Sequence, residues 1–264
     1  MQLISHTLAN NQVPYITLSK GNAASKPSVV VMARQHSGEV WSSHLADELM
    51  RQLAEQRSSW AKWMLDNFTF RIFPMVNIDG VIYGNFRCDL AGYDLNRCWG
   101  KPSLLIHPHL VSIKQTLAAF SQEGKVEMYL DLHTHSRDIG VFAYCSVDSD
   151  KARELPTLIS KHTPIFRLPA CTFGLSKEKM NTARAAMFGL ANTLNTLTVE
   201  LSAFGHLTCD KRAIRAYEPI TLGYFASALL KAFRKYIDPH FVPPKVGNPN
   251  QLSTSQVHDA LEPE

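Results

Sequence analysis

Short runs of β-branched apolar residues alternate along this chain with segments of helical periodicity. The run PSVVVMAR (27–34) is typical of a strand buried on both faces. Trp41, Leu45, Leu49 and Leu53 then recur every four residues, as on one face of a helix. Further strands are expected at 13–20, 68–76, 125–136, 140–147 and 193–202, and further helices at 109–120, 150–162, 182–191 and 218–237. This alternation predicts an α/β domain whose sheet is covered on both faces.

Composition limits the size of the domain and its partners. With 264 residues, 45% of them hydrophobic, the chain is long enough for one large α/β domain or at most two small ones. A net charge of +4 without a block of Lys and Arg argues against a nucleic-acid partner. Since no apolar run approaches the ~20 residues of a bilayer span, we expect no membrane segment.

The chain ends and the cysteines suggest a compartment and a domain boundary. The N-terminus MQLISHTLANNQ lacks the pattern of a signal peptide, and five scattered cysteines without a CxxC pair fit reduced thiols. We therefore expect a cytoplasmic protein. Pro, Asn, Ser and Gln dominate the last segment, so we expect one domain at 1–237 and a loosely ordered tail at 238–264.

Polar side chains stand where several predicted strands end. His36 and Glu39 follow the strand at 27–34, His133 and His135 end the strand at 125–136, and Glu200 ends the strand at 193–202. In open α/β sheets the ligand crevice lies beyond the carboxyl ends of the strands. We therefore expect these side chains to converge, although each of them alone has an ordinary structural explanation.

Two histidines and one glutamate form a ligand set that leaves one position open on zinc, as catalytic sites require. The spacing of His36 and Glu39 allows both to reach one ion from a turn that enters a helix. We expect the rings of His133 and His135 to point to opposite faces of this strand, so that at most one of them faces the site. Glu200 lies in the apolar run LTVELS, where a carboxylate is costly unless it serves a purpose, and it is our candidate general base.

A long irregular stretch, VIYGNFRCDLAGYDLNRCWG (81–100), carries further polar candidates. Long loops inside compact domains are usually functional or disordered. Asp94, Asn96 and Arg97 lie in this loop, although Arg97 also fits an ordinary loop salt bridge.

Six motifs occur in an order and spacing that resemble those of the zinc metallocarboxypeptidases: ARQHSGE, VNIDG, NFRCDLAGYDLNRCW, DLHTHSR, FGLSKEKMNTAR and LTVELSAFG. The resemblance is greatest to the cytosolic carboxypeptidases, which trim glutamates from protein C-termini and from side-chain polyglutamate. It covers roughly residues 9 to 237. It implies a single α/β domain around a mixed, mostly parallel eight-stranded sheet flanked by helices.

The resemblance also implies a role for each matching residue. His36, Glu39 and His133 match the ligands of one zinc ion, and Asp94 matches a carboxylate that orients the first histidine. Glu200 matches the general acid/base, and Arg87 the arginine that polarises the scissile carbonyl. Asn96 and Arg97 match the pair that grips the terminal carboxylate of the substrate, for which a guanidinium fork is well suited.

The position that selects the terminal side chain lies some fifteen residues before the catalytic glutamate in this family. Arg184 lies 16 residues before Glu200, so the resemblance implies a preference for acidic C-terminal tails of peptides or proteins. Lys177, Lys179 and Arg137 in neighbouring motifs would steer such tails inward. The alternative places Arg184 on the solvated face of a helix. The oligomeric state is undefined by the sequence.

Three features depart from the family pattern. No counterpart of the β-sandwich domain that precedes the catalytic domain in the cytosolic branch is present in these 264 residues. Ser37 and Ile78 replace prolines, which changes backbone rigidity but removes no chemical group. No tyrosine lies between Thr172 and Glu200, where the digestive enzymes carry a mobile one.

Two other functions stay open at this point. Small-molecule deacylases of the aspartoacylase and succinylglutamate-desuccinylase type also use HxxE, a distant histidine and a DLNR-like string. The turn NIDG, Arg87 and the stretch LSKEKMNTAR favour the peptidase instead. A non-catalytic protein that binds acidic tails is the third possibility, against which the complete set of chemical groups argues.

Overall fold

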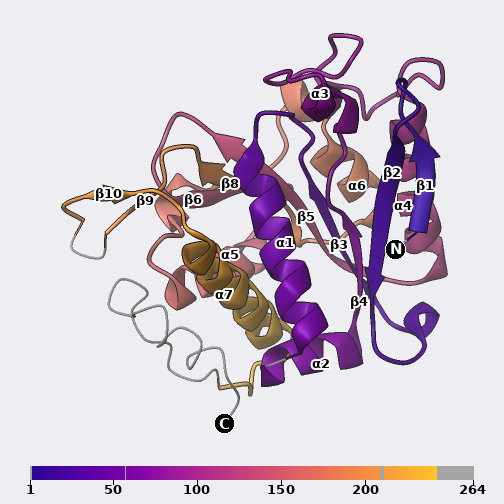
Figure 1. Cartoon of the computed structure of the whole chain (residues 1–264). Helices are drawn as coiled ribbons and strands as arrows, with labels where there is room; N and C mark the ends of the chain where they lie inside the picture. The colour runs from indigo at the N-terminus through magenta and orange to yellow at the C-terminus, as the bar shows by residue number, and fades with distance from the viewer. Residues whose placement is uncertain (1, 57, 209–210, 243–264) are drawn as a thin grey trace.

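A computed structural model describes residues 2–56, 58–208 and 211–242. Figure 1 shows a central twisted sheet with helices packed against it on both sides. Within the described residues, no helix is both long enough and apolar enough to cross a bilayer.

The main sheet has eight strands in the order β1-β2-β4-β3-β5-β8-β6-β7. β4, β3, β5 and β8 run parallel at its centre, and four of its seven strand pairings are parallel. The strands are β1 (Gln2–His6), β2 (Gln12–Leu18), β3 (Ser28–Ala33), β4 (Thr69–Phe73), β5 (Val126–His135), β6 (Val141–Cys145), β7 (Thr172–Phe173) and β8 (Thr196–Ser202). The prediction of a mixed, mostly parallel eight-stranded sheet is confirmed. β9 (His206–Leu207) and β10 (Ile214–Arg215) form a separate hairpin.

The two faces of the sheet belong to two separate hydrophobic cores. Because strand side chains alternate, Val29, Val31 and Ala33 of β3 enter one core, while Val30 and Met32 enter the other. The first core is covered by α1 (Val40–Glu55), α2 (Ser59–Asn67), α5 (Asp150–His162) and α7 (Pro219–Ile237), and the second by α4 (Pro108–Glu123) and α6 (Ala183–Ala191).

The chain changes direction in the sheet on either side of β3. It leaves β3 through α1 and α2 to reach β4 on one side, and it returns through α4 to β5 on the other side. The two connections cover opposite faces, so a crevice opens between the carboxyl ends of β3 and β5. This is the part of the sheet at which the predicted site residues converge.

One predicted turn is a helix. The segment NIDG (77–80), expected as a turn, instead begins the short helix α3 (Ile78–Ile82). The Asn77 side chain accepts a hydrogen bond of 3.0 Å from the Gly80 N–H and so caps this helix. Ile78 occupies the first helical position, where proline is also favoured, so its presence there does not disturb the backbone.

Several short or edge elements were not expected from the sequence. They are β1, α2, β7 and the β9–β10 hairpin, together with four 3-10 turns: Ala23–Ser25, Leu95–Arg97, Leu168–Ala170 and Lys177–Lys179. α2 has a clear N-cap, because the Ser58 hydroxyl accepts a hydrogen bond from the Ala61 N–H. Elements of this length carry too few residues for a periodicity to be recognised.

The first residues of the expected tail, 238–242, lie within the described part of the chain. Phe241 is buried, and the Arg234 guanidinium lies 3.9 Å from its ring centroid. Lys235 Nζ donates a hydrogen bond of 2.7 Å to the Phe241 carbonyl oxygen. Residues 238–242 therefore pack against α7, whereas 243–264 lie outside the described residues.

Candidate active site

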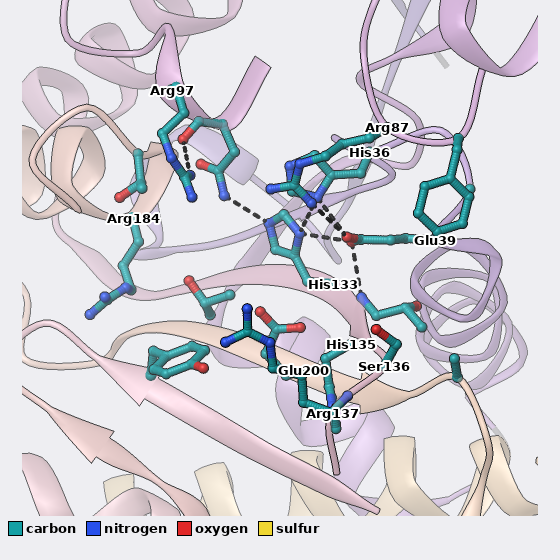
Figure 2. Close-up of a pocket in the computed structure, with 18 of the residues that line it drawn as sticks. His36, Glu39, Arg87, Arg97, His133, His135, Ser136, Arg137, Arg184 and Glu200 are labelled. Atoms are coloured by element: carbon teal, nitrogen blue, oxygen red, sulfur yellow. Dashed lines mark hydrogen bonds and ion pairs between the residues drawn. The ribbon is translucent and has the colours of Figure 1, made fainter. Parts of the chain in front are cut away.

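A cavity of about 420 Å³ opens at the carboxyl ends of the central strands. Figure 2 shows side chains from the turn after β3, the long loop, the ends of β5 and β8, and α6 facing into it. It is lined by eight of the nine residues predicted from the sequence: His36, Glu39, Arg87, Asn96, Arg97, His133, Arg184 and Glu200. The ninth, Asp94, lies directly behind His36.

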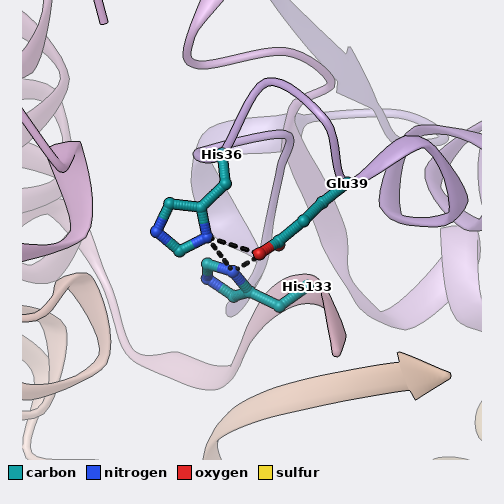
Figure 3. Close-up of side chains that lie close together, drawn as sticks. All are labelled: His36, Glu39 and His133. Carbon is teal, nitrogen blue, oxygen red and sulfur yellow. Dashed lines mark hydrogen bonds and ion pairs between the residues drawn. The ribbon is translucent and has the colours of Figure 1, made fainter. Parts of the chain in front are cut away.

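His36, Glu39 and His133 form a compact cluster (Figure 3). His36 Nδ1 lies 2.6 Å from Glu39 Oε1, and His133 Nδ1 lies 2.9 Å from Glu39 Oε2. The two Nδ1 atoms are 3.2 Å apart. One ligand atom from each residue thus falls within 4.8 Å of the others.

The turn between β3 and α1 brings this cluster together. Glu39 is the N-cap residue of α1, and its carboxylate accepts a hydrogen bond from the Thr134 N–H at the end of β5. Gly38 donates its N–H to the Phe86 carbonyl oxygen at 2.7 Å, and a Cβ at Gly38 would lie 2.6 Å from that oxygen. Only glycine allows the long loop to approach the turn so closely.

Ser37 accounts for one departure from the family pattern. Its hydroxyl donates a hydrogen bond of 2.7 Å to the Asn85 carbonyl oxygen. The turn is therefore tied to the long loop by a side-chain contact that proline cannot make.

Each histidine of the cluster has a carboxylate behind it. Asp94 Oδ1 lies 3.0 Å from His36 Nε2, and Asp131 Oδ1 lies 3.1 Å from His133 Nε2. Asp94 also accepts hydrogen bonds from Arg87 Nε and Nη2, at 2.9 and 2.8 Å. Burial alone would raise the pKa of Asp94, but its contacts with His36 and Arg87 hold that pKa well below its usual value.

Asp131 was not among the residues predicted from the sequence. It lies in the apolar strand YLDLHTH, so the same signal that singled out Glu200 was present there. The structure adds what the sequence lacked, namely the direction of its side chain toward His133.

The cluster fits a divalent metal ion. When each Nε2 donates its hydrogen to a carboxylate, each Nδ1 presents a lone pair to the other and to Glu39. Such groups repel one another unless positive charge lies among them. Two imidazole nitrogens and one carboxylate are a ligand set that zinc binds.

The protonation tendencies of the cluster agree with this. Burial would raise the pKa of Glu39, but His133 and His36 hold it well below its usual value. Burial likewise would lower the pKa of His133, yet the carboxylates of Asp131 and Glu39 bring it well above its usual value. The surroundings therefore favour a positive charge at the position of the cluster.

Glu200 lies beside the cluster but outside it. In the parallel pairing of β5 and β8 it is the register partner of His133. Its carboxylate makes no hydrogen bond or ion pair with any described residue, and burial raises its pKa to about 7. A carboxylate in this state is suited to accept and return a proton near neutral pH.

Arg184 projects from α6 into the cavity (Figure 2). It is only 5% exposed, and its Nη1 atom has no hydrogen-bond partner among the described residues. The alternative prediction, which placed Arg184 on a solvated face of the helix, is therefore wrong. Burial lowers the pKa of its guanidinium, so the site holds an unpaired cation that an anionic group would stabilise.

Asn96 and Arg97 also line the cavity. Asn96 Oδ1 accepts a hydrogen bond from the Ala183 N–H at 2.8 Å, and its Nδ2 lies 3.2 Å from His133 Nε2. Arg97 Nη1 donates to the Asn96 carbonyl oxygen at 2.8 Å, which leaves its other N–H groups for the cavity. Asn96 thus positions the start of α6 as well as lining the site.

The rim of the cavity carries more positive charge, and two residues are not where the sequence predicted. Lys179 and Arg137 line the cavity as expected, whereas Lys177 does not. His135, whose ring was expected to point away from any site that His133 faces, also lines the cavity. The expectation was wrong because residues two apart in a strand point to the same face, so His133 and His135 both face the cavity.

Sequence comparisons relate the chain to known proteins. A family model described as zinc carboxypeptidase matches residues 1–160. Cytosolic carboxypeptidase 3 of Mus musculus is 32% identical over 255 residues, which cover 90% of this chain and 25% of that protein. Cytosolic carboxypeptidase 6 of Caenorhabditis elegans is 31% identical over 245 residues, covering 88% and 53%. The chain therefore spans between a quarter and about half of the length of these relatives.

Solved structures share the fold. A metallo-carboxypeptidase from Burkholderia cenocepacia superposes with a TM-score of 0.78 at 22% identity, covering 91% of this chain and 65% of its own. A metallo-carboxypeptidase from Pseudomonas aeruginosa superposes with a TM-score of 0.74 at 17% identity, covering 88% and 63%.

Proposed function

Because this chain belongs to the zinc carboxypeptidase family, we propose that it is a zinc-dependent hydrolase that removes C-terminal residues, glutamate above all, from peptides or protein tails. One observation carries the proposal: a single cavity contains the His/Glu cluster together with the Glu200 carboxylate and the buried Arg184 guanidinium, neither of which is paired with another residue in the described part of the chain. These are the groups needed to hold a metal, to move a proton and to bind an acidic side chain.

We propose that His36, Glu39 and His133 hold the zinc ion. When bound, zinc acts as a Lewis acid that polarises a carbonyl group and lowers the pKa of a water molecule. Asp94 orients His36 by accepting the hydrogen of its Nε2.

Glu200 acts as the general base and acid in this proposal. Its carboxylate has no competing partner among the described residues and lines the cavity. It takes a proton from the attacking water and then gives it to the nitrogen of the leaving amino acid.

Arg87 supports the charge that develops on the scissile carbonyl oxygen. Its Nε and Nη2 atoms are held by Asp94, and its Nη1 lies 3.8 Å from Glu39 Oε1. The guanidinium is thereby fixed with Nη1 beside the cluster, where the negative charge of the carbonyl oxygen would develop.

The opposite end of the cavity binds the terminal residue. Arg97 and Asn96 grip the free α-carboxylate, and Arg184 pairs with the side-chain carboxylate of glutamate. Lys179 lies in the same positive field. Burial and the nearby charges of Arg97 and Arg184 lower its pKa, so the three cations act on one another.

We further propose that residues 1–237 are the catalytic unit and that the protein acts in the cytosol. The family match and the eight-stranded sheet lie within this range. The compartment follows the names of the curated relatives, which are cytosolic carboxypeptidases.

A pair of peptides that differ only at the C-terminus tests the proposal. A peptide ending in glutamate with a free carboxylate should be shortened by one residue, whereas the same peptide with a C-terminal amide should be cleaved at least a hundredfold more slowly. The carboxylate clamp provides the physical reason, because an amide offers no charge to Arg97. Mass spectrometry of the products reads the outcome. Equal cleavage of both peptides, or cleavage inside the chain, would refute exopeptidase action.

A further inference from the structure

A line of buried polar side chains lies behind His133, and the proposed mechanism does not use it. Gln35 Nε2 donates a hydrogen bond of 2.5 Å to Asp131 Oδ1, the oxygen that faces His133 Nε2. Trp99 Nε1 donates a hydrogen bond of 2.7 Å to Gln35 Oε1. All four side chains are almost completely buried, with exposures between 0% and 2%.

Asp131 is an expensive residue for this position. Its exposure is 0%, and the ion pair with His133 is its only one among the described residues. Its Oδ2 atom has no hydrogen-bond partner there. Its register partners on β3 and β8 are Met32 and Thr198, neither of which carries a charge, so packing on this face of the sheet would favour an uncharged side chain.

The directions of the hydrogen bonds from Trp99 to Gln35 and from Gln35 to Asp131 explain why a carboxylate is needed beside His133. Gln35 must donate its amide hydrogen to Asp131, because its amide oxygen is already occupied by the Trp99 N–H. Asp131 Oδ1 can therefore only accept, and it accepts from His133 Nε2 as well. The amide nitrogens of Asn96 and Gln35 also lie near Nε2, at 3.2 and 3.5 Å, but they cannot accept its hydrogen. With that hydrogen directed at Asp131, His133 presents the Nδ1 lone pair to Glu39 and His36.

We propose that Asp131, set in place by Gln35 and Trp99, is a positioning residue that fixes the orientation and tautomer of His133 and strengthens metal binding. The proposal rests on the proposed function, since it assumes that the cluster holds zinc. Asp94 pairs with two ionisable groups, His36 and Arg87, whereas His133 is the only ion-pair partner of Asp131 among the described residues. Its effect on metal affinity should be correspondingly large.

The chain of hydrogen bonds from Trp99 through Gln35 to Asp131, called the relay below, also joins the metal cluster to the substrate side of the site. Trp99 lies in the long loop two residues after Arg97, and its backbone N–H donates to the Asn181 carbonyl oxygen at 3.1 Å. Its ring is buried in the second core. The loop that carries the carboxylate clamp therefore also sets the outer partner of His133.

The test measures zinc affinity in Asp131→Asn, prepared as the full chain. The dissociation constant for zinc, obtained by competition with a chromophoric chelator, should rise about 10- to 100-fold, and zinc should be released faster. Trp99→Phe keeps an aromatic ring but removes the indole N–H that holds Gln35, and should raise the dissociation constant several-fold. Asp89→Asn is the matched control: Asp89 is another buried aspartate beside a histidine, 3.3 Å from His107 Nε2, and its replacement should leave zinc affinity unchanged.

The thermal stability of the metal-free proteins separates positioning from a purely structural role. Metal-free Asp131→Asn should unfold somewhat below the wild-type temperature, because the change breaks a buried pair with His133, but a variant that still folds and binds zinc more weakly assigns the lost affinity to positioning. A wild-type zinc affinity in Asp131→Asn, with hydrolysis intact, would overturn the inference alone. A wild-type chain that binds no zinc would overturn the proposed function with it. If Asp131→Asn fails to fold, an unchanged affinity in Trp99→Phe contradicts the relay.

Discussion

Glu39 and Glu200 line the same cavity but have opposite electrostatic surroundings. The two histidines beside Glu39 hold its pKa far below the usual value, whereas burial raises the pKa of Glu200 to about 7. Two like groups whose pKa values are driven apart are typical of divided catalytic roles. Glu39 is thereby suited to hold a cation permanently, and Glu200 to exchange a proton.

Replacing Glu200 with glutamine should abolish most turnover while the fold and the metal remain. An amide of the same shape cannot accept a proton, so kcat should fall by about 10²–10⁴. Elemental analysis should find zinc unchanged, because Glu200 makes no contact within the cluster. A variant with near-normal kcat would exclude Glu200 as the general base.

The pH dependence of kcat/KM should show an acid limb. Glu200 accepts a proton only when ionised, so activity should rise with pH through its pKa, which burial brings to about 7. A cation in the cluster favours the carboxylate, so the limb should lie at or below pH 7 and above the ordinary value of 4.5. Initial rates between pH 4.5 and 9 measure this. A rate that falls as the pH rises from 5 to 7 would contradict it.

The free energy of unfolding should also depend on pH through the raised pKa of Glu200. A raised pKa means that the folded state binds the proton of Glu200 more tightly than the unfolded state does. The corresponding stability is fully present below pH 4.5 and is lost as the pH rises through about 7. The Glu200→Gln variant should therefore gain stability relative to wild type across this window.

Arg184 should select the terminal side chain. In Arg184→Met, loss of a charge-assisted hydrogen bond costs about 1.5–3 kcal/mol, so kcat/KM for C-terminal glutamate should fall about 10- to 100-fold. A substrate ending in leucine should be nearly unaffected. Arg153→Met serves as the control, because Arg153 lies on α5, outside the residues that line the cavity. If Arg184→Met weakens all substrates alike, the selector lies elsewhere.

At the scale of elements, α7 buries a charge far from the site. Lys231 lies in the middle of this helix, is 2% exposed, and places Nζ 4.0 Å from the centroid of the Trp60 ring on α2. Burial lowers its pKa from 10.5 to about 8. The contact with the indole ring returns only part of the cost of burying the ammonium group.

Lys231→Met should therefore stabilise the protein. Each pKa unit corresponds to about 1.4 kcal/mol, and with the lost cation–π contact subtracted we expect a gain of about 1–2 kcal/mol at pH 7. Because the pKa of Lys231 is lowered in the folded state, the wild-type protein recovers the lost stability as the pH rises from about 8 toward 10.5. The advantage of Lys231→Met over wild type should therefore shrink in that range. Urea unfolding at pH 7 and 9.5 measures both. A destabilised variant at pH 7 would show that the aromatic contact outweighs the burial.

At the scale of the whole molecule, the metal should connect segments that are distant in sequence. His36 and Glu39 come from the turn before α1, and His133 comes from β5, nearly a hundred residues later. An ion held by all three stabilises the folded state, in which alone the three lie together.

Zinc removal should consequently lower the melting temperature. At a free zinc concentration a thousandfold above the dissociation constant, binding contributes about 4 kcal/mol, or a shift of roughly 10 °C for a domain of this size. Differential scanning fluorimetry with and without a chelator measures it, and added zinc should restore the difference. His36→Ala, which lacks one ligand, should be insensitive to the chelator. Identical melting of wild type in both conditions would argue against a structural contribution of the metal.

Local patterns in the sequence determined the class of fold and most of the residues in the cavity. The β-branched run at 27–34 and the four-residue repeat after it specify their structures through burial, whatever the rest of the chain does. Glu200 was recognisable because a carboxylate in an apolar strand needs a partner or a purpose. The motif resemblance then supplied Arg87 and Arg184, whose places in the cavity no local pattern indicates.

Only the tertiary structure decided which groups meet. The register of β5 against β8 sets Glu200 beside His133, and a shift of one residue would turn it to the opposite face. Asp131 shows the same signal as Glu200, but its role depends on Gln35, 96 residues earlier, and on Trp99 behind that. Such contacts join segments that local propensity treats as independent, because their energies arise only when the packed sheet excludes water around them.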